Sequence, residues 1–199
     1  MEIKELLDDY GTTYAEQAGI TLRDKPAPLF QLLVLSAMSA IRISADIAAA
    51  AAGELFRAGW RTPQRMREST WQQRVDALGR GGYRRYDEST ATYLDKIAAQ
   101  LIDDHGGDLR RIRPGKSGSV GDLEKALQEF PRIGGTGAAI FCREVQAVWP
   151  EVAPYFDKQA LDAAADLGFG RDPYKLAAKV PKSKVAPLSA ALVRYRHHK

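Results

Sequence analysis

The sequence is poor in cysteine and has no long apolar run. Its one cysteine, Cys142, excludes a disulfide within the chain and a metal site made of four cysteines. The alanine-rich stretch over residues 43–55 is interrupted by Asp46 and Glu54, and it is too short to span a bilayer. Residues 1–9 are acidic and hold no apolar segment, so no signal peptide is expected. These absences predict a cytoplasmic protein.

Strand-like alternation of apolar and polar residues is also missing, as is any internal repeat. Helical patterns take their place. Leu29 to Met38 is almost entirely apolar, which is typical of a buried helix, and Thr62-Pro63 marks the start of another helix. With 199 residues, 45% of them hydrophobic and 27% charged, the chain can bury one sizeable core or two small lobes that share a cleft. The expected fold class is therefore all-α.

Charge is spread unevenly along the chain. The formal net charge is only +4, but the segment from Pro173 to Lys199 holds seven Lys or Arg residues and no acidic residue. Taking away those seven positive charges leaves about −3 on the rest of the chain. A basic segment of this kind suits a polyanion such as nucleic acid. A solvated terminal helix is the alternative.

The most informative stretch is a helix, a glycine turn and a second helix over residues 120–149. Apolar residues recur at helical spacing until Pro131, whose ring stops the first helix. Gly134 and Gly135 allow a tight turn, because glycine adopts conformations that other residues avoid. A second helix is then expected to run to about Trp149.

The start of that second helix is a candidate anion site. Its first backbone N–H groups have no partner within the helix, and the helix dipole favours a negative charge there. Gly134, Gly135 and Gly137 carry no side chain that would block a phosphate. On spacing alone, an ordinary helix–turn–helix corner with glycines at the turn stays open as the alternative.

Residues 130–139, F-P-R-I-G-G-T-G-A-A, resemble the helix–hairpin–helix of the endonuclease III-type (HhH-GPD) DNA glycosylase superfamily. Further along, that family has a Pro-containing loop and an essential Asp that opens the next helix. Pro150 and Asp157 stand at similar places here. Upstream, residues 30–38, F-Q-L-L-V-L-S-A-M, are similar to an early core helix of the family. The resemblance spans about residues 28–168, with three motifs in the family's order.

This resemblance implies two helical lobes with the hairpin at the mouth of the cleft. One lobe would hold residues 1–28 and 160–199, and the other residues 29–159 with the hairpin at 120–149. It also implies a DNA glycosylase, which hydrolyses the N-glycosidic bond of a damaged or mispaired base flipped from duplex DNA in base excision repair. A monomer associated with the nucleoid is expected.

Asp157 is the residue that the resemblance marks as catalytic. Base release passes through a state like an oxocarbenium ion, which a fixed carboxylate stabilises, and the carboxylate can also orient or deprotonate the attacking water. The apolar run from Val152 to Phe156 would keep the acid partly dry, and its place at a helix start favours the ionised form. The alternative is a simple helix N-cap, and the two roles are compatible.

Departures from the family pattern bear on the chemistry. Members that also cleave the strand have a lysine at the position of Thr136, and its amine forms a Schiff base with the sugar. Threonine cannot do this, so a monofunctional glycosylase without lyase activity is expected. Arg132 replaces the first hairpin glycine, where its side chain can contact a phosphate. Because one cysteine cannot bind the four-cysteine iron–sulfur cluster of several relatives, no cofactor is expected, with a monovalent cation at the hairpin left open.

Base flipping requires a side chain that fills the gap in the stack. Met38 stands where endonuclease III has a glutamine, and it is the candidate apolar wedge, with a core methionine as the alternative. Tyr83 and Tyr86 are candidates for stacking on the extruded base, unless they close a helix start over the core. The candidate phosphate contacts outside the hairpin are basic: Arg42, Arg84 and Arg85.

Two other functions stay open. One is a non-catalytic helix–hairpin–helix DNA-binding protein, in which Asp157 only caps a helix. The other is an unrelated helical interaction protein, which a salt-dependent affinity for DNA would exclude. The sequence also leaves the excised base open among alkylated purines, mismatched thymine or uracil, and mispaired adenine.

Overall fold

All regular secondary structure in the part of the chain that the structure describes is helical. The structure is a computed structural model that describes residues 1–198; Lys199, the last basic residue of the C-terminal segment, lies outside the described residues. Residues 1–198 form twelve α-helices and two 3₁₀ helices and contain no strand, which confirms the all-α prediction. None of these helices is both long and apolar enough to cross a membrane.

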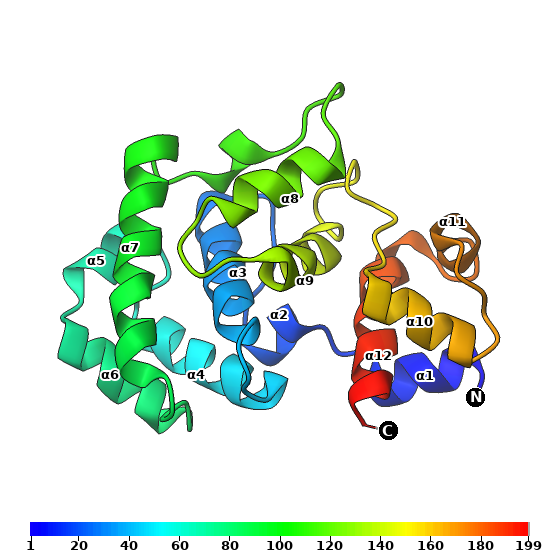
Figure 1. Cartoon of the computed structure of the whole chain (residues 1–199), viewed down its shortest axis with the longest axis horizontal. Coiled ribbons are helices and arrows are strands. Elements are labelled where there is room, and N and C mark those ends of the chain that lie inside the picture. The colour runs from blue at the N-terminus through cyan, green and yellow to red at the C-terminus, as the bar shows by residue number, and fades with distance from the viewer. Residues whose placement is uncertain (199) are drawn as a thin grey trace.

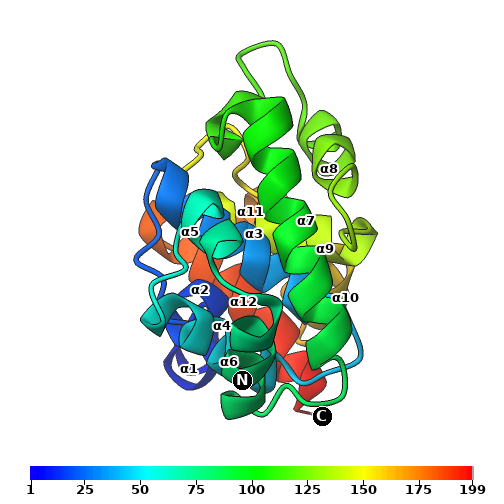
Figure 2. The ribbon, with the colours of Figure 1, turned by 90° about the vertical axis from the view of Figure 1, so that its left-hand side faces the viewer.

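The larger of two helical bodies is built around one buried helix, α3. Every side chain from Leu29 to Met38 is buried, because α3 packs against α4 on one side and α9 on another. Figure 1 shows this arrangement, and Figure 2 shows α5, α6 and α7 together on the side nearest to the viewer. The helices of this body are α2 (Tyr14–Gln17), α3 (Pro26–Ser39), α4 (Ala45–Arg57), α5 (Pro63–Glu68), α6 (Trp71–Arg80), α7 (Asp87–His105), η1 (Leu109–Ile112), α8 (Val120–Gln128) and α9 (Gly135–Val145).

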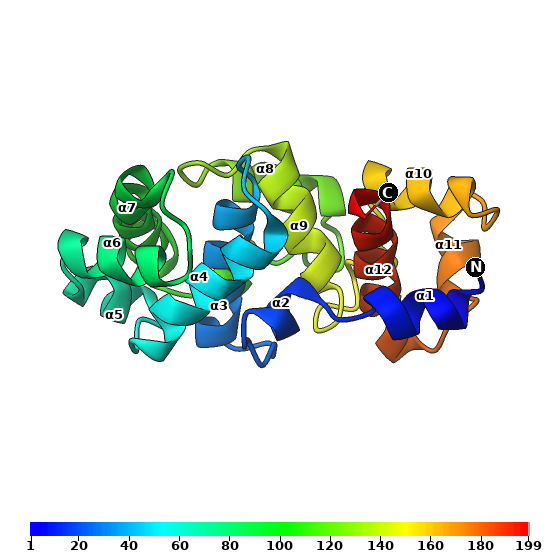
Figure 3. The same cartoon turned by 90° about the horizontal axis from the view of Figure 1, so that it is seen from below.

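The smaller body joins the two ends of the chain. Its central helix, α12, packs against α1 and α10, and a second hydrophobic core that includes Leu6 and Leu192 lies between them. Figure 3 shows the C-terminal end of α12 beside α10. The helices of this body are α1 (Ile3–Tyr10), α10 (Lys158–Asp166), α11 (Pro173–Ala177), η2 (Lys182–Lys184) and α12 (Val185–His197).

The two hydrophobic cores divide the chain near the expected places but not at them. Tyr14 and Ile20 belong to the larger core, although residues 1–28 were expected in the terminal lobe. Phe156, which lies ahead of the expected boundary at residue 160, belongs to the smaller core. The chain therefore passes between the cores after α1 and again in the loop before Asp157.

The predicted hairpin is present, and both of its helices end earlier than expected. α8 ends at Gln128 and α9 at Val145, not near Pro131 and Trp149. Bonds to carbonyls three residues back follow each helix, so the last turn tightens and the helix stops; the donors are the N–H groups of Glu129 and Phe130 after α8, and of Ala147 and Val148 after α9. The hairpin turn consequently spans residues 129–134, and a longer loop leads from α9 to α10.

Candidate functional site

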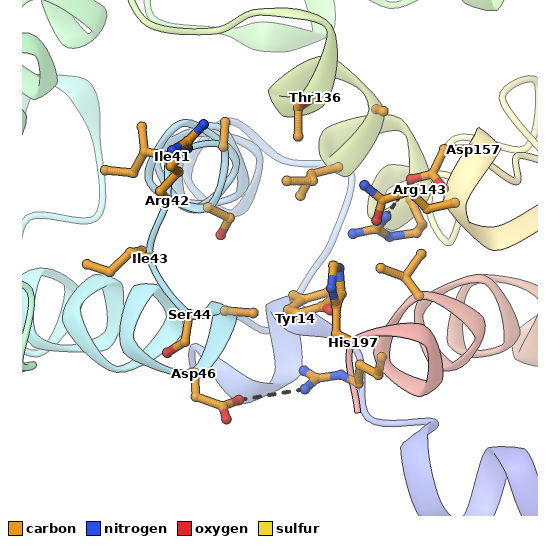
Figure 4. Close-up of a pocket in the computed structure, with 18 of the residues that line it drawn as sticks. Tyr14, Ile41, Arg42, Ile43, Ser44, Asp46, Thr136, Arg143, Asp157 and His197 are labelled. Atoms are coloured by element: carbon orange, nitrogen blue, oxygen red, sulfur yellow. Dashed lines mark hydrogen bonds and ion pairs between the residues drawn. The ribbon is translucent and has the colours of Figure 1, made fainter. Parts of the chain in front are cut away.

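A cavity of about 710 Å³ lies where the two bodies meet. It is lined by the turn between α3 and α4, the inward face of α9, the start of α10, the end of α12, and Tyr14. Gly135, Thr136, Asp157 and Arg42 all line it, so the start of the second hairpin helix and the acid face one cavity. Figure 4 shows Thr136 on one wall and Asp157 on the neighbouring wall.

Helical periodicity explains which residues of α9 reach this cavity. Thr136, Ala139, Ile140 and Arg143 line it, at spacings of three, four and seven that place them on one helix face. Arg143 follows Thr136 by seven residues, which corresponds to about 10 Å along the helix axis. The helix therefore presents small residues near its start and a cation two turns further along.

Asp157 caps α10 and also forms an ion pair. Its Oδ1 accepts a hydrogen bond of 2.9 Å from the Ala160 N–H, which confirms the N-cap role. Its Oδ2 accepts a bond of 2.6 Å from Arg143 Nη1. The side chains of Asp157 and Arg143 are only 12% and 4% exposed, so the pair is shielded from bulk water on most sides. Both oxygens of the candidate catalytic acid are thus held in place.

One glutamine fixes the loop that carries this acid. Gln146, just after α9, is buried, and its amide donates to the Arg143 and Tyr155 carbonyls at 2.8 Å each. Its side-chain oxygen accepts the Tyr155 N–H, also at 2.8 Å. These bonds tie the loop to the end of α9 two residues before Asp157. They explain how a loop residue is held against a helix residue.

Arg143 itself sits in a mostly buried polar cluster. Its guanidinium carbon lies 5.3 Å from the centre of the Tyr14 ring, and its Nε has no hydrogen-bond partner. The adjacent Glu144 is buried and accepts the N–H groups of Tyr14 and Ala15 at 3.3 and 3.0 Å. Burial raises the pKa of Glu144, although Arg143 and these bonds act in the opposite direction.

A second arginine links the two bodies across the cavity. The guanidinium carbon of Arg194, on α12, lies 4.1 Å from the centre of the Tyr14 ring. Its Nε donates to the Thr12 carbonyl at 3.0 Å, and its Nη1 lies 3.8 Å from a carboxylate oxygen of Asp46 on α4. The dashed line at Asp46 in Figure 4 marks this pairing. Tyr14 therefore lies against one arginine from each body.

The start of α9 is open, as an anion site requires. Gly134 is the N-cap residue, and no side chain caps the helix there. A Cβ placed on Gly134 or Gly135 would meet no atom within 4 Å, and both residues are exposed. Gly137 differs from the prediction: it is buried, and a Cβ there would lie 3.3 Å from Ile133 and 3.4 Å from Ala40. Its role is close packing of α9 on α3, not contact with DNA.

Arg132 occupies a glycine-like backbone conformation. Its φ is +63°, the left-handed region that side chains with a Cβ avoid. The side chain is exposed and lies over the Tyr93 ring at 5.5 Å, and it does not line the cavity. A glycine would adopt this conformation without strain, so Arg132 keeps a glycine-like turn and adds a positive charge beside it.

Two of the predicted DNA contacts are core residues. Met38 and Tyr83 are wholly buried, and the Tyr83 hydroxyl donates to the Met38 carbonyl at 3.2 Å. Neither can reach a base or a base stack in this conformation, so the wedge and stacking roles were wrong and the core alternatives are correct. Burial also raises the pKa of Tyr83. Tyr86 is half-buried at the start of α7 and contacts the Arg85 guanidinium.

The other predicted basic contacts are divided between two places. Arg42 lies in the turn between α3 and α4 and lines the cavity. Arg84 and Arg85 are exposed but belong to the turn before α7, outside the cavity lining. The turn that carries Arg42 also places Ile41 and Ile43 at the cavity, so apolar side chains line it although Met38 does not.

Several cavity residues were missed from the sequence. Arg143 was detectable in principle, because it falls on the same helix face as Thr136, seven residues on. Tyr14, Arg194 and His197 were not, because they reach the cavity only through the packing of α2 and α12. No local pattern marks them.

No protein-family model matches the sequence, and no curated protein matches it either. Solved structures do match. A structure of endonuclease III trapped covalently on DNA, an estranged-adenine complex, aligns with a TM-score of 0.54 and 19% identity over 97% of this chain and 85% of that chain. A non-covalent endonuclease III–DNA complex aligns with a TM-score of 0.53 and 19% identity over 98% and 86%. This chain therefore has the endonuclease III fold, two helical bodies with a helix–hairpin–helix beside the cavity between them.

Proposed function

We propose that this chain is a monofunctional DNA glycosylase that hydrolyses the N-glycosidic bond of a damaged or mispaired base in duplex DNA. It would act as a monomer in base excision repair on the nucleoid. The observation that carries the proposal is that Asp157 shares one cavity with Gly135 and Thr136 at the open start of α9. In this proposal the carboxylate acts on the sugar of the nucleotide, and the start of α9 binds a phosphate of the DNA backbone. The likeness to endonuclease III–DNA complexes supports it at the level of the fold.

The cavity suits a nucleotide turned out of a duplex. Its volume of about 710 Å³ lies within the range of roughly 300–1,000 Å³ that is usual for small-molecule sites. Cationic side chains outnumber acidic ones in its lining, which favours a phosphate-bearing ligand. The cationic residues are Arg42, Arg143, Lys158 and Arg194, and the acidic ones are Asp46 and Asp157. Ile41, which lines the cavity from the turn between α3 and α4, is proposed to fill the gap that the flipped base leaves.

The chemistry assigned to Asp157 is electrostatic stabilisation and water positioning. As the base departs with the bonding electrons, positive charge develops at the sugar, and a fixed carboxylate lowers its energy. The oxygen of a water molecule then bonds to the sugar carbon while the carboxylate accepts its proton. Each Asp157 oxygen accepts one hydrogen bond from the protein, and a carboxylate oxygen has room for a second. The acid can therefore still accept a bond from this water.

Strand cleavage is not expected from this cavity. Thr136 stands where a Schiff-base lysine would be, and a hydroxyl cannot form an imine. Arg143 lies on the same helix face, but a guanidinium stays protonated and is not a nucleophile at neutral pH. Lys158 lines the cavity, and its ammonium group lies 2.8 Å from Asp162 Oδ2. We therefore propose simple hydrolysis that leaves an abasic site.

An iron–sulfur cluster plays no part in this proposal. The residues do not fit one, because such a cluster needs four thiolates and the sequence has one cysteine. Cys142 is buried in α9, and burial raises the pKa of its thiol, which disfavours the thiolate. Within residues 1–198, no group of three or more His, Cys, Asp or Glu side chains is placed to hold a metal ion.

The test is a panel of labelled duplexes, each with one altered or mismatched base, followed by hot alkali. Strand breaks that appear only after alkali support a monofunctional glycosylase, and Asp157→Asn should abolish them. Breaks without alkali would contradict the proposal that there is no lyase activity. Full activity in Asp157→Asn would show that another residue provides the catalysis.

A non-catalytic DNA-binding protein is the second candidate. It is favoured by one specific observation, the 2.6 Å bond between Asp157 and Arg143. A cation so close to the acid offsets part of the negative charge that the transition state would use. DNA binding with no alkali-labile site across a broad panel would support this candidate over the enzyme.

A further inference from the structure

Three cations converge on a single acid beside the cavity. Asp162, on the second turn of α10, pairs through Oδ2 with Lys158 Nζ at 2.8 Å and with Arg196 Nη1 at 3.5 Å. Its Oδ1 binds Arg171. The cations come from the first residue of α10, the turn after α10 and the last turn of α12. The fold therefore gathers them from three separate segments; we call Lys158, Arg171 and Arg196 the cation cluster.

The charges of this group do not balance. One carboxylate neutralises one of the three cations and leaves a surplus of two positive charges. Asp162 is mostly buried, with a side chain only 12% exposed, whereas the three cations are 87%, 61% and 42% exposed. Bonds to Lys158 and Arg171 lower the pKa of Asp162, so the acid stays ionised and keeps holding them. The surplus charge consequently faces solvent, where an external anion can reach it.

The cluster adjoins the cavity through Lys158, which lines the cavity directly after Asp157. Arg171 and Arg196 lie outside the lining, and Arg196 directly precedes His197, which lines the cavity from α12. Figure 3 shows the end of α12 beside α10, which is the place where the cluster forms. The open start of α9 lines the same cavity from the larger body. A strand that enters the cavity would thus meet positive charge on both bodies.

We propose that the cation cluster is a second backbone-phosphate site, which binds a phosphodiester of the same DNA duplex whose other phosphate lies at the start of α9. This inference rests on the proposed function, because its ligand is the DNA substrate. Charge, not base identity, is what the cluster can recognise, since phosphate contacts carry no sequence information. Asp162 holds the three cations close together against their mutual repulsion.

The test is the salt dependence of affinity for a short undamaged duplex, measured by fluorescence anisotropy. The logarithm of the binding constant falls linearly with the logarithm of salt concentration, with a slope of about −0.9 for each phosphate bound. Arg171→Ala/Arg196→Ala should make this slope shallower by about one for each phosphate that the variant no longer binds. Lys158 is left unchanged so that the residue next to Asp157 is not disturbed.

A matched control removes two arginines elsewhere. Arg65 pairs with Glu68, and Arg67 lies 3.4 Å from Asp95, at the opposite end of the molecule (Figure 1). Arg65→Ala/Arg67→Ala changes the net charge by the same amount and should leave the slope unchanged. Thermal melting of both double variants establishes that each is folded. Equal slopes for the two would overturn the cluster as a phosphate site.

Asp162→Asn separates direct binding from a structural role. It keeps all three cations and removes the acid among them, so the slope should be retained. If the salt slope of Asp162→Asn is as shallow as that of Arg171→Ala/Arg196→Ala, the cation cluster does not contact a phosphate directly. If the wild-type chain shows no salt-dependent DNA binding, the cluster and the proposed function both fail. If the wild-type chain binds DNA and Arg171→Ala/Arg196→Ala has the same salt slope as Arg65→Ala/Arg67→Ala, this inference fails and the proposed function stands.

Discussion

Arg143 Nη1 lies 2.6 Å from Asp157 Oδ2, so the candidate catalytic acid is paired with a buried cation. The two residues belong to α9 and to the N-cap of α10, and the long loop between them is closed by this contact. The pair has a structural role, because it joins the hairpin to the smaller body. It also fixes one oxygen of a carboxylate that lines the cavity.

The first prediction concerns the energetic coupling of this pair. Arg143→Met and Asp157→Asn should each lower the free energy of unfolding by about 3 kcal/mol, because each leaves a mostly buried charge without its partner. The double variant should be less destabilised than the sum of the two by at least about 1 kcal/mol. Urea denaturation of the four proteins measures this. Simple additivity would mean that the contact does not contribute to stability.

The second prediction concerns Thr136, the position at which the resemblance predicts a lysine in enzymes that also cleave the strand. Thr136→Lys places an amine in the cavity on the face where Thr136 lies, and it should allow a Schiff base with the sugar. Borohydride should then trap a covalent protein–DNA complex that the wild type does not form. Gln128 is an exposed residue of α8 outside the cavity. Gln128→Lys therefore adds an amine away from the site, and this control protein should form no covalent complex with DNA. Trapping of the wild type would refute the monofunctional assignment.

The third prediction contrasts two glycines of the hairpin. Gly137→Leu should lower stability by about 2 kcal/mol, since its side chain would press on Ile133 and Ala40 across the contact with α3. Gly135→Ala should leave stability almost unchanged, because nothing lies within 4 Å of the added Cβ. It should nevertheless weaken DNA binding by crowding the open helix start. Thermal melting and anisotropy separate the two effects, and equal affinity of Gly135→Ala and wild type would argue against a phosphate there.

The fourth prediction is a pH dependence that comes from Glu144. Burial raises the pKa of Glu144 in the folded chain above its unfolded value of about 4.3, so the folded state binds this proton more tightly than the unfolded state does. Its contribution to stability is therefore greatest below that unfolded value and is lost as pH rises through the raised pKa. Glu144→Gln removes this proton linkage.

The stability of wild type relative to Glu144→Gln should accordingly fall as pH rises from about 4 toward neutrality. Denaturation midpoints across this range measure the difference between the two proteins. Other acids, whose pKa values are lowered by ion pairs, titrate alike in both and cancel. Parallel profiles would show that burial does not perturb the Glu144 carboxyl.

The helices and the hairpin were predictable from local features. Pro131 and the glycines after it mark the turn, and the apolar run in α3 marks the central helix. Asp157 was predicted as a cap because a cap position depends on local sequence, and as a residue of the cleft because of the resemblance. The helix ends were placed too late, since tightened last turns at Gln128 and Val145 leave no mark in the hydrophobic pattern.

The cavity walls were not predictable to the same extent. Met38 and Tyr83 were assigned to DNA because their residue types suit it, but burial depends on how α3 and the turn before α7 pack. Arg143 shares a helix face with Thr136, but nothing in the local sequence shows which partner its charge has. Asp157, the partner of Arg143, reaches it through the loop before α10, whose backbone at Tyr155 is hydrogen-bonded to Gln146.

The most direct test of the account is to measure free base by mass spectrometry in a single-turnover reaction of wild type and Asp157→Asn with the responsive duplex from the panel. The account predicts that wild type releases one free base for each altered site and leaves the strand intact, and that Asp157→Asn binds the duplex but releases none. Release of base at the wild-type rate by a folded Asp157→Asn variant would contradict it.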